Sequence, residues 1–216
     1  MATEQTPDKK ERPKHFIELA TAIIISLATI ASAWCAYQGT LWGGIQTFRL
    51  SAVNALGRKS SEQTIRAGQM RTIDGILFIE YLKGKERHKD FLADFFYKRF
   101  RPEAKRATDA WLATNPFQNP QAPPHPFIME EYSLEPEREA KRLSEESTQK
   151  FEEARQANEN SDDYIMITVI FASVMFFGGI STQFESPRYR TTLLVIGGIV
   201  LSVALGLLTT YPVALE

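Results

Sequence analysis

The chain has 216 residues, a formal net charge of −1, 44% hydrophobic residues and a mean hydropathy of −0.23. This length suffices for one domain plus a few membrane spans. A chain without net positive charge lacks the electrostatic field that attracts nucleic acid, so no nucleic-acid partner is expected. The only cysteine is Cys35, which excludes an intrachain disulfide and leaves the redox compartment open.

Three apolar segments lie near the two ends of the chain. The first, residues 16–37, carries one charge, Glu18, and the segments 164–182 and 191–211 carry none. The first segment would rise roughly 33 Å as a helix, against a hydrocarbon core of about 30 Å. A secretory signal peptide is the competing interpretation. Trp34 and Tyr37 at the far end are typical of an interfacial aromatic belt and favour an uncleaved span.

Basic residues next to these segments predict their orientation. The tail 1–15 holds Lys9, Lys10, Arg12 and Lys14, and the turn 183–190 holds Arg188 and Arg190. The tail 212–216 has no basic residue. Basic short loops favour the cytoplasm, so the polar domain 38–163 is expected on the other side of the membrane.

Helical spacing of apolar residues runs through much of the polar domain. The first span should continue as one helix to a turn at Lys83–Lys85, with this inward stripe: Leu41, Ile45, Phe48, Ala52, Leu56, Ala67, Met70, Ile73, Leu77 and Tyr81. A second helix should cover 88–100, with Phe91, Leu92, Phe95, Phe96 and Phe100 inward. A third should begin at Pro102 and end near Trp111 or Leu112. A last polar helix should start near Ser133 and run into the second span.

The segment 114–136 interrupts these helices. It holds six of the eleven prolines, which nearly excludes regular structure: Pro116, Pro120, Pro123, Pro124, Pro126 and Pro136. Apolar residues between the prolines favour a strap packed over the helices rather than a free polyproline ligand. The predicted fold class is therefore an all-α membrane protein with three transmembrane helices and a helical-bundle polar domain between spans 1 and 2.

The two ends of the polar domain carry opposite charge. Residues 49–106 hold fourteen basic and seven acidic side chains, whereas residues 135–163 hold ten acidic and five basic ones. Because these arms leave successive spans, we expect them to pair antiparallel. Exposed ion pairs stabilise little, about 0–1 kcal/mol each. The opposite charges would therefore determine which arms pair more than they stabilise the pair.

No motif for chemistry stands out. The sequence lacks a phosphate loop, a nucleophile elbow and a zinc helix, and His15, His88 and His125 lie far apart. We therefore expect no catalytic residue, cofactor or metal. Small residues at four-residue spacing, which let helix backbones approach closely, predict a helix-packing interface: Ala28, Ser32, Ala36, Gly198, Ser202 and Gly206. Packing within one subunit and packing between subunits both stay open.

The runs SAWCAYQ, NPQAPPHPF and TVIFASVMFFGGIST resemble those of a family of small uncharacterised bacterial integral membrane proteins. The resemblance implies three spans with a helical insert, and hence the inner membrane, but no activity or site residue. We expect a non-enzymatic scaffold or accessory subunit that self-associates and could bind a further membrane protein. One alternative is a small oligomeric channel or transporter lined by Thr21, Ser26, Thr29 and Ser32. Another is a ligand-binding membrane sensor.

Overall fold

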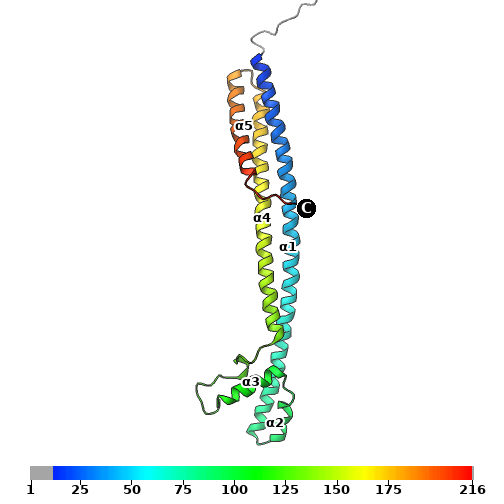
Figure 1. The fold of residues 1–216 in the computed structure, drawn as a ribbon, viewed down its shortest axis with the longest axis vertical. Coiled ribbons are helices and arrows are strands. Elements are labelled where there is room, and N and C mark those ends of the chain that lie inside the picture. Colours follow the sequence, from blue (N-terminus) through cyan, green and yellow to red (C-terminus); the bar gives the residue numbers. More distant parts are fainter. Residues whose placement is uncertain (1–11, 216) are drawn as a thin grey trace, which may run out of the picture. The chain divides into compact units, whose positions relative to one another are not determined.

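The computed structural model describes residues 12–215, with side chains from His15 onward. It has five α-helices and one short 3-10 helix within that range: α1 (Arg12–Glu86), α2 (Asp90–Tyr97), α3 (Pro102–Ala113), η1 (Pro126–Ile128), α4 (Glu135–Ser181) and α5 (Pro187–Leu208). Figure 1 shows these elements, and no strand occurs among the described residues. The predicted all-helical fold is confirmed.

Three of the helices, α1, α4 and α5, are long and apolar enough to cross a membrane. This confirms the three predicted spans by length and composition. Both α1 and α4 continue without a break from an apolar stretch into a polar one. Lys9 and Lys10 of the basic tail lie outside the described residues, and the side chains of Arg12 and Lys14 are not described either.

The chain divides into two compact units, Met1–Leu50 with Phe151–Glu216, and Ser51–Lys150. We call the first the membrane unit and the second the head. The head is shorter than the predicted polar domain 38–163 by thirteen residues at each end, because those residues belong to the membrane unit. Within the membrane unit α1, α4 and α5 lie side by side (Figure 1) and bury one cluster: Ala28, Cys35, Tyr164, Ile167, Phe171, Val174, Leu201 and Ala204.

The C-terminal tail is held on the membrane unit by side-chain hydrogen bonds. The amide of Gln38 donates to the carbonyl oxygen of Ala214 at 3.4 Å and accepts from the Ala214 N–H at 2.8 Å, as a neighbouring strand would. Trp42 Nε1 and the Tyr164 hydroxyl both donate to the Pro212 carbonyl oxygen, at 3.1 and 3.2 Å. These contacts explain why the residues just beyond Tyr37 belong to the membrane unit.

Inside the head, α1 and α4 run antiparallel. The Ser60 hydroxyl donates to the Ala140 carbonyl oxygen at 2.8 Å, and seven residues back along α1 the Val53 carbonyl oxygen accepts from Ser147 at 3.3 Å. Arg71 of α1 pairs with Glu137 of α4 at 2.9 Å in the head, and Arg49 pairs with Glu153 of the same two helices at 3.6 Å in the membrane unit. Arg142 of α4 instead pairs with two glutamates of its own helix. Serine hydrogen bonds and ion pairs thus both join the two helices.

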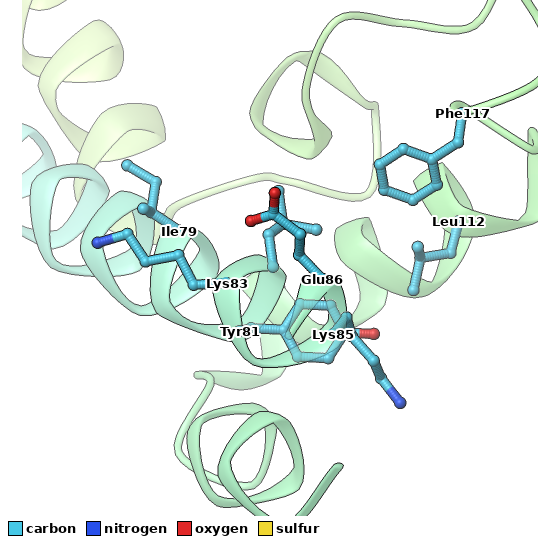
Figure 2. A pocket seen from close by; sticks show the side chains of 8 residues that line it. Ile79, Tyr81, Lys83, Lys85, Glu86, Leu112 and Phe117 are labelled. Atoms are coloured by element: carbon cyan, nitrogen blue, oxygen red, sulfur yellow. The ribbon is translucent and has the colours of Figure 1, made fainter. Parts of the chain in front are cut away.

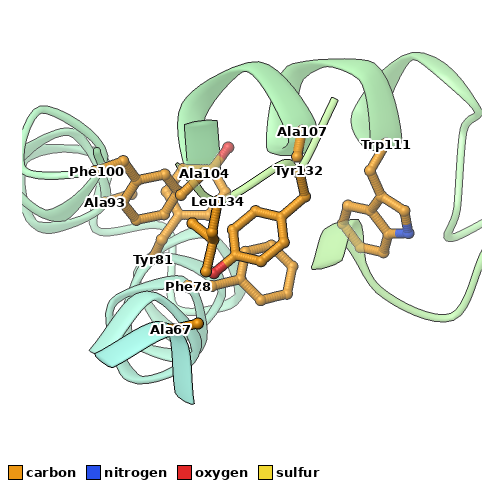
Figure 3. Packing of buried hydrophobic residues seen from close by; sticks show 10 residues of the cluster. All are labelled: Ala67, Phe78, Tyr81, Ala93, Phe100, Ala104, Ala107, Trp111, Tyr132 and Leu134. Atoms are coloured by element: carbon orange, nitrogen blue, oxygen red, sulfur yellow. The ribbon is translucent and has the colours of Figure 1, made fainter. Parts of the chain in front are cut away.

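The core of the head is rich in aromatic residues (Figure 3). Phe78 of α1 packs edge-on against Trp111 of α3 and Phe127 of η1, with ring centroids 5.4 and 5.6 Å apart. The proline-rich segment packs onto the helices, because Trp111 Nε1 donates to the Pro123 carbonyl oxygen at 2.6 Å and Pro126 is buried. The last turn of α1 packs closely against α2, since a Cβ on Gly84 would lie 2.8 Å from the backbone nitrogen of Ala93.

Candidate functional site

A buried carboxylate connects three parts of the head. Asp74 of α1 is 1% exposed and accepts hydrogen bonds from Arg101 Nε at 3.1 Å, Arg101 Nη2 at 2.5 Å and the Tyr132 hydroxyl at 2.8 Å. Arg101 also donates to the Met70 carbonyl oxygen. A buried charge with this many partners is satisfied, so the network ties α1 to the start of α3 and to the residues before α4.

Two tyrosines of the head have perturbed acidity. Burial raises the pKa of Tyr132, and its hydrogen bond to Asp74 raises it further. Burial and a hydrogen bond to Asp109 raise the pKa of Tyr97 to about 12. Both phenols thus stay protonated donors at neutral pH, which suits a structural bond rather than proton transfer. Across the described residues no group of three or more His, Cys, Asp or Glu side chains could hold a metal ion.

The head also contains a pocket of about 600 Å³ (Figure 2). Its apolar lining consists of Ile79, Tyr81 and Leu82 of α1 together with Leu112 and Phe117, and the remaining lining residues are Lys83, Lys85 and Glu86. Each lysine has an acidic partner, Glu80 at 2.6 Å and Asp90 at 3.1 Å respectively. The pocket is therefore apolar with a charge-balanced rim, a composition and size suited to a small apolar ligand.

Helix α2 has two apolar faces. Ala93 is buried in the core and Phe96 and Tyr97 pack against it, whereas Phe91 is 85% exposed and Leu92 and Phe95 are exposed as well. The prediction that all the apolar residues of this helix point inward is wrong for those three. We call Phe91, Leu92 and Phe95 the outer α2 face.

A second exposed apolar surface lies on α1 within the head. It consists of four isoleucines that are each more than half exposed, which we call the isoleucine face: Ile65, Ile73, Ile76 and Ile79. Beside them lie Gly68 and Gly75, where an added Cβ would meet nothing within 4 Å. Glycine inside a helix costs roughly 0.5–1 kcal/mol against alanine, and no contact within the described chain requires it at these two positions. The predicted inward stripe of α1 is wrong at Ile73, because Asp74 is the buried residue there, and also at Phe48, which is 79% exposed.

The predicted small-residue interface divides between the inside and the outside of the membrane unit. Ala28 is buried in the cluster, Ser32 is half-buried and Ala36 is exposed. On α5 the inward residues are Leu194, Gly197, Leu201 and Ala204. Gly198, Ser202 and Gly206 point elsewhere, and a Cβ on either glycine would meet nothing within 4 Å.

The hydroxyls proposed to line a channel do not share one surface. Thr21 is buried and donates to the Ile17 carbonyl oxygen, while Thr29 is exposed and donates to the Ile25 carbonyl oxygen. Ser26 is exposed and Ser32 is half-buried. Glu18 lies 3.9 Å from the Arg190 guanidinium and 3.7 Å from the His15 ring, so its carboxylate has one cationic neighbour, Arg190, at the end of the membrane unit.

Sequence reasoning missed Asp74, the tail contact of Gln38 and the outward position of Phe91. The partners of Asp74 follow it by 27 and 58 residues and that of Gln38 by 176, so no local motif marks them. One signal was available for Asp74. It falls on a three- and four-residue spacing with Ala67, Met70, Phe78 and Tyr81.

No family model matches the chain, and no curated protein and no solved structure matches it. The resemblance to a family of bacterial membrane proteins therefore stays a prediction.

Proposed function

We propose that the chain is a non-enzymatic integral membrane protein that self-associates and acts as a scaffold or accessory subunit. The isoleucine face carries this proposal. It lies outside the apolar segments 16–37, 164–182 and 191–211, on a stretch of α1 that also carries the charged residues Arg66, Arg71 and Glu80, so lipid cannot cover it. Exposed apolar surface of this extent in water marks an interaction site.

A second copy of the chain is the occupant that fits this face best. The residues between the isoleucines on that side of α1 are uncharged: Gly68, Gln69, Thr72 and Gly75. A face that meets its own copy must avoid like charges, and on this side of α1 the charged residues next to the isoleucines lie before the face, at Glu62, and after it, at Glu80 and Lys83, rather than between them. The two glycines would let the backbones of paired α1 helices approach closely. Two copies inserted in one membrane with the same orientation would bring each isoleucine next to its equivalent.

The outward row on α5 supports a second contact in the membrane. Gly198 and Gly206 are not used for packing inside the chain, and small residues at this spacing favour helix association in lipid. We infer that the head lies on the extracytoplasmic side of a bacterial inner membrane, because Arg188 and Arg190 favour a cytoplasmic turn.

Light scattering with detergent correction tests self-association. We expect wild type to be an oligomer in mild detergent, and Ile76→Lys to shift it towards monomer, because two lysines would meet at the interface. Thr64→Lys is the matched control, since Thr64 is exposed on the same helix outside the isoleucine face. A monomeric wild type would contradict the proposal. Gly198→Leu with Gly206→Leu separately tests the membrane contact.

A ligand-binding sensor is a second candidate, favoured by the pocket beside Tyr81 and Leu112. Apolar compounds should raise the melting temperature of wild type, because binding to the folded state stabilises it. Leu112→Trp should abolish this shift by filling the pocket. An equal shift in both proteins would place the binding elsewhere.

A further inference from the structure

The outer α2 face has no role in the core and is surrounded by positive charge. Phe91 and Phe95 lie one helical turn apart on the side of α2 opposite Ala93. Arg87, His88 and Lys89 precede the helix, and Lys98 and Arg99 follow it. The wider segment 83–106 has nine basic and four acidic side chains, a net charge of +5.

The nearby acidic residues neutralise two of these lysines, because Asp94 pairs with Lys98 at 2.6 Å and Asp90 pairs with Lys85 at 3.1 Å. The positive charge beside the outer α2 face therefore comes from Arg87, Lys89 and Arg99. The Arg99 guanidinium lies 3.4 Å from the centre of the Phe95 ring and donates to the Phe95 carbonyl oxygen, so a cation is held directly beside the exposed aromatic surface. The result is an aromatic surface with a cationic border.

We propose that the outer α2 face docks onto the surface of an anionic phospholipid bilayer, with Phe91 inserting among the headgroups and the basic residues contacting phosphate. Exposed aromatic side chains bordered by lysine and arginine match both components of such a surface, its apolar interior and its negative charge. The isoleucine face has an acidic neighbour, Glu80, as well as the basic Arg66 and Arg71, so it lacks a purely cationic border, and the two surfaces suit different occupants.

The contact proposed for the outer α2 face does not depend on self-association, and a bilayer supplied separately from the one that holds the chain tests it.

Co-sedimentation tests the proposal with the full chain. The protein is embedded in nanodiscs of phosphatidylcholine and mixed with sucrose-loaded vesicles, either of phosphatidylcholine alone or with phosphatidylglycerol added. We expect the protein to pellet with the anionic vesicles only, less so at high salt because screening weakens the charge contacts. Empty nanodiscs should stay in the supernatant.

Two matched variants locate the contact. Phe91→Ser should lower binding about tenfold, since the insertion of one phenylalanine side chain is lost. Phe117→Ser should bind like wild type, although Phe117 is also 76% exposed in the head. Lys89→Glu should weaken binding to the anionic vesicles. Equal binding to neutral vesicles, no binding to anionic ones, or unchanged binding of Phe91→Ser would each overturn the proposal, the second leaving the face to a protein partner.

Discussion

Removal of the Asp74 carboxylate should destabilise the head strongly. Asp74→Ala leaves the Arg101 guanidinium and the Tyr132 hydroxyl without the acceptor that they share. Breaking a buried ion pair costs about 3–5 kcal/mol. Because the Arg101 side chain is 28% exposed and regains some hydration, the lower end, about 3 kcal/mol, is expected. For a domain of this size that lowers the melting temperature by roughly 15 °C.

The three tryptophans make the measurement specific. Trp34 and Trp42 lie in the membrane unit and Trp111 in the core of the head, so a background with Trp34→Phe and Trp42→Phe reports on the head alone. Tyr132→Phe should cost less, about 1.5 kcal/mol, because only one hydrogen bond to a charged group is lost. The double variant should cost less than the sum, since both changes break the same bond. If Asp74→Ala melts within one or two degrees of the background, the network does not hold the head together.

Four further outcomes are expected. Gly84→Ala should destabilise the head by about 1–3 kcal/mol because its Cβ would overlap Ala93, whereas Gly57→Ala, which meets nothing, should be neutral or stabilising in the same thermal assay. Thr108→Val should be neutral or stabilising, because the buried hydroxyl has no hydrogen-bond partner among the described residues; a loss of several degrees would mean that the hydroxyl is bonded. The pKa of Tyr97 is raised from 10 to about 12 in the folded head, so between these pH values only the unfolded chain loses the phenol proton. The free energy of unfolding should therefore fall from about pH 10 to about pH 12, and it should fall less steeply in Tyr97→Phe. Equal slopes in the two proteins would contradict this. A reporter active only outside the cytoplasm should be active at Asn119 and silent at Pro187, and the reverse pattern would invert the orientation.

Element boundaries were predictable where local residues determine them. The turn expected at Lys83–Lys85 lies at the end of α1, and Pro102 begins α3. Both boundaries depend on a local residue, Gly84 for the end of α1 and a proline at the first helical position for α3. The antiparallel arms also followed from chain connectivity and helical spacing. Their charges predicted part of the contact, because Arg71 pairs with Glu137 and Arg49 with Glu153 across the arms, whereas Arg142 and Arg155 pair within α4.

The inward and outward sides were harder to predict. Helix α2 has apolar residues all round, so periodicity alone could not separate Phe91 from Phe96. In α1, hydrophobicity predicted that Ile73 is buried and that its neighbour Asp74 is exposed, whereas Asp74 is the buried residue. Such a position becomes recognisable only when the partners Arg101 and Tyr132 are known, and both come from distant parts of the chain.

Cysteine cross-linking in native membranes tests self-association through the isoleucine face most directly. With the buried Cys35 replaced by alanine, Ile76→Cys places one thiol on the face, and Thr64→Cys places one elsewhere on the same helix. Paired α1 helices with the same orientation should bring the introduced thiols of two Ile76→Cys chains together, so a short bifunctional maleimide should yield a covalent dimer from this variant and little from Thr64→Cys. A monomeric Ile76→Cys, or equal cross-linking at both positions, would contradict the account.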